Sequence, residues 1–207
     1  MTTAERIVNH LLLYSGNLSA IGLYTGKTGV AMALGTYGHA HGLSEVEEYA
    51  QELLQEALEQ VFETLPAGLH SGLAGVGYAL AYLKRHAGLE VDLSDALYDI
   101  DRHIMAYDPR RLADASLRTG AAGIWCYRCM RLEAEPDAAV FDAAYTAELR
   151  TALRRMGADE SRIGARLMPL DLKRPQWAPA DFLDHGMALD DGAAYYLIHS
   201  EPPCQPS

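Results

Sequence analysis

Residues 22–29 read GLYTGKTG, and the spacing of their glycines decides the fold. Taken alone, the stretch is similar to a phosphate-binding loop, in which a glycine-rich turn ends in Gly-Lys-Thr or Gly-Lys-Ser. That loop requires a glycine at position 21, where the chain has Ile21. The residues before it also lack the apolar run of a buried parallel strand. The pattern argues against a nucleotide site, and the glycines need another explanation.

The same spacing returns along the chain. The spaced glycines are Gly22, Gly26 and Gly29, then Gly68, Gly72 and Gly75, then Gly120 and Gly123, with a degenerate copy at Gly186. Gly26 and Gly72 are 46 residues apart, and Gly72 and Gly120 are 48 apart. This period is typical of helical-hairpin repeats. Glycines at the start of a buried helix let its first turn approach a neighbouring backbone closely.

Two kinds of helix alternate between these glycines. Residues 44–65 have apolar side chains at three- and four-residue steps, which predicts an amphipathic outer helix. Residues 68–85 are uncharged as far as Lys84 and apolar on all sides, which predicts a buried inner helix. Further outer helices are expected at 4–14, 94–108 and 136–157, and further inner helices after the first and third glycine groups and within 183–198.

No segment has the alternation of a strand. We therefore predict an all-α fold, an α/α toroid-like array or partial α/α barrel of about four helical hairpins. Residues 1–200 are expected to form a single domain, and residues 201–207 a flexible tail.

The charge of the 207-residue chain narrows the choice of partner. Its formal net charge of −11 argues against nucleic acid and anionic membranes as partners. The first residues form neither a signal peptide nor a spanning helix, so we expect a cytoplasmic protein. Cys126, Cys129 and Cys204 are too few and too irregularly spaced for a disulfide framework, and reduced thiols are expected.

Polar residues occur where the inner helices begin. If the repeats stack in register, Tyr24 and Lys27 of the first, His70 of the second and Arg118 of the third lie together. Polar groups above an apolar lining are typical of a ligand cleft. The same residues would serve equally well as ordinary cap and turn residues.

Three stretches carry a resemblance to a known family: GLYTGKTGVAMAL, GLHSGLAGVGYALAYL and LRTGAAGIWCYRC. They resemble the repeated helix starts of lanthionine synthetase C-like (LanC-like) proteins. The family's α/α toroid contains about twice as many helices, so the resemblance implies a short member or half a ring. It also implies a role in maturing peptides of the lanthipeptide kind.

The resemblance further implies a zinc site. In the family, zinc bound by two cysteines and a histidine activates a peptide thiol for addition to a dehydrated Ser or Thr. The family's first zinc cysteine has a context similar to residues 125–127, Trp-Cys-Tyr, and its Cys-His-Gly motif corresponds to residues 184–186, Asp-His-Gly. The implied ligands are Cys126, Asp184 and His185, with an aspartate in place of a cysteine. Cys126 and Cys129 have a second interpretation, as small buried residues of an inner helix.

The acid–base histidine of the family precedes a repeat glycine directly. Ser71 stands at that position here and His70 one residue earlier, so His70 is the candidate catalytic residue. These departures favour a non-catalytic peptide-binding or scaffold component. The first alternative is a zinc-dependent cyclase that forms thioether bonds with altered ligands. A weaker one is a glycan-processing toroid enzyme, for which Asp190 and Asp191 are the one candidate carboxylate pair.

An array of four hairpins has an open edge. Inner helices that a full ring would cover need a partner, because a large exposed apolar surface favours association. We therefore expect a peptide or protein partner, and a homodimer or complex formed through the open edge.

Overall fold

The computed structural model describes residues 1–61, 65–164 and 170–200, with the main chain alone at Ser200. All regular structure in these residues is helical, which confirms the all-α prediction. The elements are α1 (Thr3–Tyr14), η1 (Ser15–Asn17), α2 (Lys27–His41), α3 (Ser44–Glu59), α4 (Leu73–His86), α5 (Leu93–Ala96), α6 (Tyr98–Met105), η2 (Pro109–Arg111), α7 (Ala121–Ala134), α8 (Ala143–Arg155), η3 (Pro179–Asp184) and α9 (Ala193–Ser200). The expected tail, 201–207, lies outside the described residues.

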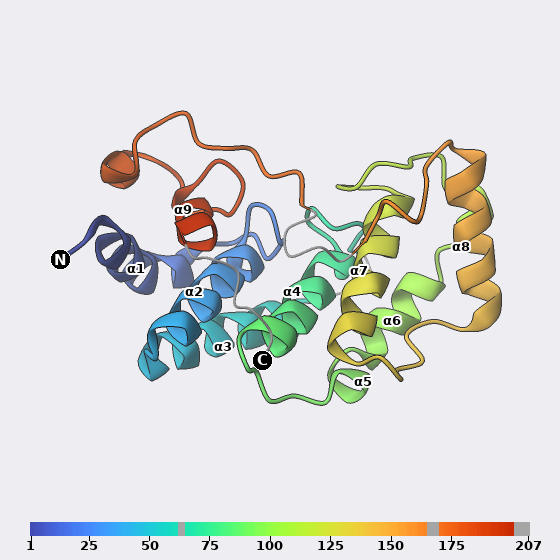
Figure 1. Ribbon diagram of the computed structural model, residues 1–207, viewed down its shortest axis with the longest axis horizontal. Helices are drawn as coiled ribbons and strands as arrows, with labels where there is room; N and C mark the ends of the chain where they lie inside the picture. The colour runs from blue at the N-terminus through green and yellow to red at the C-terminus, as the bar shows by residue number, and fades with distance from the viewer. Residues whose placement is uncertain (62–64, 165–169, 201–207) are drawn as a thin grey trace.

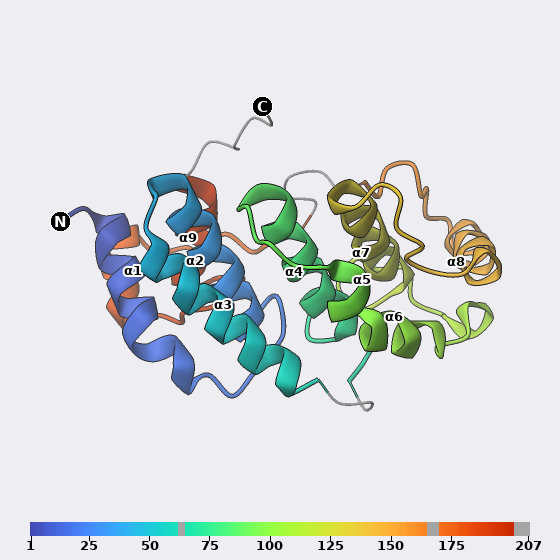
Figure 2. The same ribbon diagram turned by 90° about the horizontal axis from the view of Figure 1, so that it is seen from below.

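The helices form an inner and an outer layer. Every residue of α2 from Lys27 to Gly35 and of α4 from Leu73 to Leu83 is buried, as the apolar composition of both segments requires. By contrast α1, α3, α6 and α8 each bury one face and lie outside (Figure 2). The predicted alternation of outer and inner helices is confirmed.

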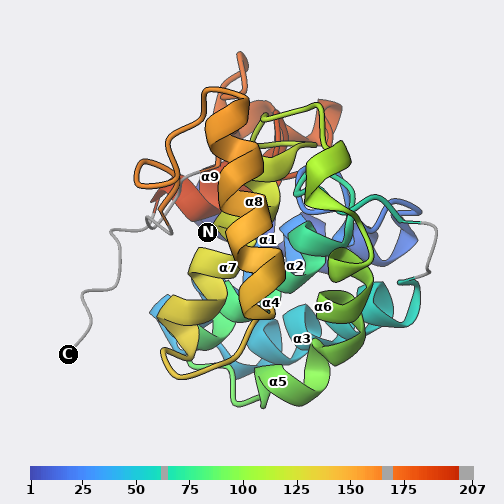
Figure 3. The same cartoon turned by 90° about the vertical axis from the view of Figure 1, so that its right-hand side faces the viewer.

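The inner helices do not follow chain order in space. Helix α2 packs against both α4 and α9, and α4 packs against both α2 and α7. The spatial order is therefore α9, α2, α4, α7, with α9 and α7 at opposite ends of the row (Figure 1). Helix α1 packs against α9 at one end. At the other end α8 packs against α7 and lies in front of it in Figure 3.

The long segment between α8 and α9 makes this order possible. It leaves the α8 end, and its described part returns across the array to η3, which packs beside α1 and α9 (Figure 1). The last hairpin thus lies next to the first one, as the closing hairpin of a ring would. The return also carries residues 170–173 over the mouths of the inner helices.

The repeat glycines are confined by backbone. A Cβ added to Gly72 would lie 1.9 Å from the Pro66 carbonyl oxygen, and one added to Gly192 would lie 2.3 Å from that of Ala188. A Cβ added to Gly186, in contrast, would meet nothing within 4 Å. The fourth repeat glycine is therefore Gly192, and the assignment to Gly186 from the sequence is wrong.

Main-chain hydrogen bonds explain the error. The carbonyl of Gly186 accepts from Ala193 N at 2.8 Å, seven residues on, just as the carbonyl of Pro66 accepts from Leu73 N at 2.9 Å. Gly186 is thus equivalent to Pro66, before the turn, and not to the glycine that begins the helix. The sequence suggested it because a glycine is permitted there, although nothing requires one.

The outer helix expected at 4–14 is confirmed as α1, whereas the other outer helices are shorter than expected. α3 ends at Glu59 rather than at 65, and residues 62–64 are not described. The expected helix 94–108 divides at Leu97 into α5 and α6. α8 begins at Ala143 rather than at 136, because the carboxylate of Asp142 accepts from Tyr145 N at 2.6 Å and caps the helix there.

None of the helices in the described part of the chain combines the length and the apolar composition that a membrane-spanning helix requires.

Candidate functional site

A ladder of main-chain hydrogen bonds joins the mouths of the four inner helices. Its rungs are the residues two positions before the repeat glycines: Asp190, Tyr24, His70 and Arg118, which we call the rim. Asp190 N donates to Tyr24 O at 2.8 Å. Tyr24 N donates to His70 O at 3.1 Å, and His70 N to Arg118 O at 2.8 Å. The repeats therefore stack in register, and equivalent positions become neighbours.

Tyr24 is the centre of the side-chain contacts at the rim. Its side chain is fully buried. The His70 ring stacks on it, with 5.2 Å between ring centres and 20° between planes. The Arg118 guanidinium lies 4.4 Å from the centre of the same ring, which is cation–π geometry. The structure thus brings together three of the four residues expected to form a cleft.

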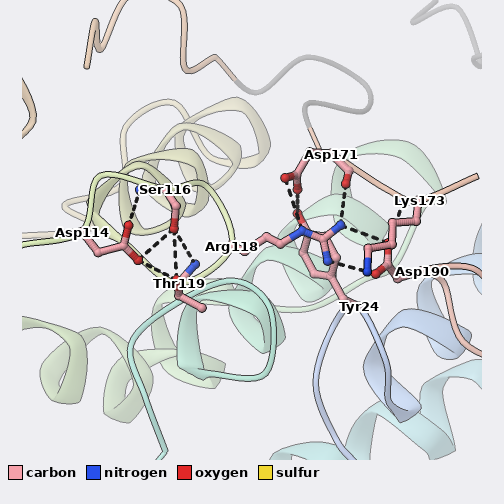
Figure 4. Close-up of polar contacts among 8 residues, drawn as sticks. All are labelled: Tyr24, Asp114, Ser116, Arg118, Thr119, Asp171, Lys173 and Asp190. Carbon is pink, nitrogen blue, oxygen red and sulfur yellow. Dashed lines mark hydrogen bonds and ion pairs between the residues drawn. The ribbon is translucent and has the colours of Figure 1, made fainter. Parts of the chain in front are cut away.

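Arg118 joins the two ends of the ladder. Its Nη1 donates to Asp190 Oδ2 at 2.9 Å and its Nη2 to Asp190 Oδ1 at 3.1 Å, a bidentate pair (Figure 4). These hydrogen bonds raise the pKa of Arg118 above its usual range. Burial acts to raise the pKa of Asp190, but hydrogen bonds from Arg118 and from Lys173 N outweigh it and hold this pKa below its ordinary value. The pair is ionised at neutral pH.

A second carboxylate, from Asp171, bridges Tyr24 and Arg118. Tyr24 Oη donates to Asp171 Oδ1 at 2.9 Å, and Arg118 Nε to Asp171 Oδ2 at 3.3 Å (Figure 4). Burial, and then the hydrogen bond to Asp171, raise the pKa of Tyr24 well above its usual range, so its hydroxyl remains a donor. Asp171 differs from Asp190 in exposure, because its side chain is 56% exposed and that of Asp190 only 7%.

The loop before α7 holds Arg118 in place. Asp114 accepts from Ser116 N at 2.7 Å, from Ser116 Oγ at 2.8 Å and from Thr119 Oγ1 at 2.6 Å (Figure 4). These donors, Thr119 first, lower the pKa of Asp114. A carboxylate that closes its own turn in this way fixes the backbone on both sides of Arg118.

Lys27 does not join the rim. Its side chain is buried against the outer layer, and its ammonium pairs with Glu56 of α3 at 2.5 Å. It stands at the first position of α2, three residues after Tyr24, and its side chain points to the other layer.

The residues present do not fit the zinc site that the resemblance implies. Cys126 is fully buried within α7, and burial raises the pKa of its thiol well above the usual range, which disfavours a thiolate ligand. The ring of His185 stacks on Trp177, with 4.4 Å between ring centres and 7° between planes. Asp184 is exposed at the end of η3. Across residues 1–61, 65–164 and 170–200, no three His, Cys, Asp or Glu side chains are grouped to hold a metal ion.

The acidic pair also differs from the arrangement that glycan hydrolysis uses. Asp190 is engaged by Arg118, while Asp191 has a left-handed backbone with φ of 56° and donates its N–H to Lys173 O at 3.0 Å. Two carboxylates flanking a cleft would instead face a common space between them. The sequence pointed to Asp190 as a partner of Asp191 rather than of Arg118, and it did not point to Asp171. The register of Gly192 is the signal that would have placed Asp190 on the rim.

One comparison with known proteins found a match, and it covers a little over half of the chain. A family model, described as lanthionine synthetase C-like protein, matches residues 18–135. This span includes the first three repeats and three of the four rim residues. Neither the curated proteins nor the solved structures gave a significant match. Because the family model covers more than half of the chain, and the fold is the expected array of α/α hairpins, the chain belongs to the lanthionine synthetase C-like family.

Proposed function

We propose that this protein is a non-catalytic component of lanthionine-type peptide modification, which binds a peptide or acts as a scaffold. Membership of the family relates the chain to lanthipeptide modification. The observation that carries the finer proposal is the rim, where Tyr24, His70 and Arg118 bring a phenol hydroxyl, a ring nitrogen and a guanidinium together at the mouths of the inner helices. Such convergent polar groups above an apolar core suit a peptide ligand.

The residues that would make a cyclase have other roles. His70, the candidate catalytic residue, stacks on Tyr24, and Cys126 is enclosed in α7. These contacts support binding over bond formation. A cytoplasmic location and a single domain of residues 1–200 are part of the proposal, and the buried thiol of Cys126 suits a reducing compartment.

Two measurements separate this proposal from a zinc cyclase. Elemental analysis of the protein purified without added zinc should give well below one zinc per chain, with no difference between the wild type and Cys126→Ala. A labelled model peptide rich in Cys, Ser and Thr should bind, in fluorescence anisotropy, more weakly to Arg118→Ala than to the wild type. Arg111→Ala is the matched control, because the Arg111 side chain is 88% exposed in η2. Stoichiometric zinc lost in Cys126→Ala would favour the cyclase.

We further propose that the protein associates with a second copy or another partner through the open edge. Three large apolar side chains, Leu13, Tyr14 and Leu183, are exposed on α1 and η3 at the α9 end of the row. Exposed apolar residues in neighbouring elements favour association. Light scattering over a concentration series should give a mass above that of one chain, and a single monomeric species at every concentration would refute this part.

A further inference from the structure

Residues 170–173, which we call the strap, lie on the rim as a bound peptide would. Arg118 Nη2 donates to the main-chain oxygen of Asp171 at 2.6 Å. Lys173 N donates to Asp190 Oδ1 at 2.6 Å, and Lys173 O accepts from Asp191 N at 3.0 Å. The strap has no regular secondary structure, and it is held through the main chain of alternate residues, as a docked extended segment is.

One polar side chain of the strap contributes to this contact, while Leu170 and Leu172 pack against the apolar core. The Asp171 carboxylate takes a hydroxyl donor from Tyr24 and a guanidinium donor from Arg118. It is more than half exposed, whereas Asp190 is buried beside Arg118. Both carboxylates lie against the Arg118 guanidinium (Figure 4). Because Asp190 is buried and Asp171 is exposed, Asp190 is part of the frame of the site and Asp171 occupies it.

We propose that the rim is a binding site for an extended peptide with an Asp or Glu side chain, and that the strap occupies it as a tethered competitor. This inference rests on the proposed peptide-binding function and deepens it by naming the ligand class. Arg118 Nε and Tyr24 Oη recognise the carboxylate, and Arg118 Nη2 and Asp190 Oδ1 recognise the main chain on either side. The carboxylate of the peptide takes the place of the Asp171 carboxylate at the rim. Binding therefore adds no negative charge to the rim of a chain whose formal net charge is −11.

The tether predicts the direction of the effect of mutation. A segment of the same chain competes at an effective concentration in the millimolar range. A free peptide therefore binds weakly to the wild type, and weakening the strap exposes the site. Asp171→Asn removes the charge but keeps the size of the side chain, and a lost charge-assisted hydrogen bond changes an equilibrium about tenfold or more.

The test uses the full chain and a peptide of residues 170–174, Leu-Asp-Leu-Lys-Arg, blocked at its C-terminus and carrying a fluorophore at its N-terminus. A second probe has Asn in place of Asp. Anisotropy titrations compare the wild type, Asp171→Asn and the control Asp181→Asn, which makes the same change at an exposed aspartate of η3. Asp171→Asn should bind the Asp peptide about tenfold tighter than the other two proteins do, and about tenfold tighter than it binds the Asn peptide.

A second substitution assigns the preference to the rim. Adding Tyr24→Phe to Asp171→Asn keeps the ring and removes the hydroxyl that donates to the carboxylate. It should reduce the preference for the Asp peptide several-fold, while the thermal unfolding midpoint confirms that the chain is folded. Equal binding by all three proteins, no preference for the carboxylate, or a preference that survives Tyr24→Phe would each overturn the proposal.

This test fails separately from that of the proposed function. The strap peptide contains no Cys, Ser or Thr, so its binding does not depend on a role in lanthionine-type modification. If it binds as described and the Cys-, Ser- and Thr-rich peptide does not bind to either the wild type or Asp171→Asn, the site is real and the assignment to peptide modification is wrong. If the Cys-, Ser- and Thr-rich peptide binds and the strap peptide does not bind as described, the strap is not a competitor and the proposed function stands.

Discussion

The register of the fourth repeat can be tested with two alanine substitutions six residues apart. At Gly192 an added Cβ would lie 2.3 Å from Ala188 O and 2.5 Å from Ala188 N, and these are backbone atoms that cannot rotate away. At Gly186 an added Cβ has open space, and the residue does not have positive φ. The two substitutions are chemically identical, so any difference between them comes from the surroundings.

The expected magnitudes follow from these distances. An overpacked site costs about 1–3 kcal/mol, and a clash with backbone falls at the upper end, so Gly192→Ala should lose about 2–3 kcal/mol. Gly186→Ala should be neutral or gain about 0.4–1 kcal/mol, because alanine restricts the unfolded chain. For a chain of this size 1 kcal/mol corresponds to about 2–4 °C, so the unfolding midpoint of Gly192→Ala should fall by about 4–12 °C.

The assay is thermal unfolding followed by circular dichroism at 222 nm, supported by urea unfolding to obtain free energies at 25 °C. Gly157→Ala provides an internal reference, because that residue has φ of 78° with no neighbour within 4 Å, so its cost is conformational rather than steric. Equal losses at positions 186 and 192, or a larger loss at 186, would refute the assignment of Gly192 as the repeat glycine and, with it, the place of Asp190 in the rim.

Three further predictions concern charged residues. Arg131→Met leaves the buried carboxylate of Asp101 without the cation that now donates to it at 2.8 Å, and should cost about 3–5 kcal/mol in urea unfolding, against less than about 0.5 kcal/mol for the exposed Arg111→Met. Lys27→Met removes a buried cation whose partner Glu56 is 49% exposed and keeps the apolar stem, so it should change stability by no more than about 1 kcal/mol, and a loss above about 3 kcal/mol would contradict this account. The pKa of Asp190 is lowered in the folded chain, so the wild type should be more stable than Asp190→Asn by its full margin at neutral pH, and this margin should decline as the pH falls below 3.8. Urea unfolding of both proteins at pH 7 and about pH 3 measures the margin, and an equal difference in stability at the two pH values would contradict the prediction.

Much of the fold follows from the sequence because its causes are local. The spaced glycines and the apolar segments that follow them predict buried helices, and the one-sided stripe of residues 44–65 predicts an outer helix. The position of α9 does not follow, because the return of the chain past α4 and α2 depends on a long segment outside the repeats. The helix ends at Leu97 and Asp142 also depend on local geometry, which apolar periodicity does not report.

The candidate site divides in the same way. Tyr24, His70 and Arg118 could be placed together because they hold equivalent positions in three successive repeats. The prediction placed Lys27 with them from its position alone, but its side chain points away from the rim and pairs with Glu56 of α3. Asp171 is 53 residues from Arg118 and belongs to no repeat, so nothing in the spacing indicates that contact.

Arg118 explains how so few repeats can share a common rim. Main-chain hydrogen bonds join Asp190 to Tyr24, Tyr24 to His70 and His70 to Arg118, but the first and last rungs have no such bond between them. The long arginine side chain spans this distance across the Tyr24 ring and makes a bidentate contact with Asp190, a geometry that the single ammonium of lysine cannot reproduce. Withdrawal of Asp171 would leave that bidentate pair in place. The strap's main chain shares Arg118 Nη2 and Asp190 Oδ1 with this pair, but the Asp171 side chain takes no part in it. A peptide that makes the same main-chain contacts can therefore exchange with the strap while the rim keeps its shape.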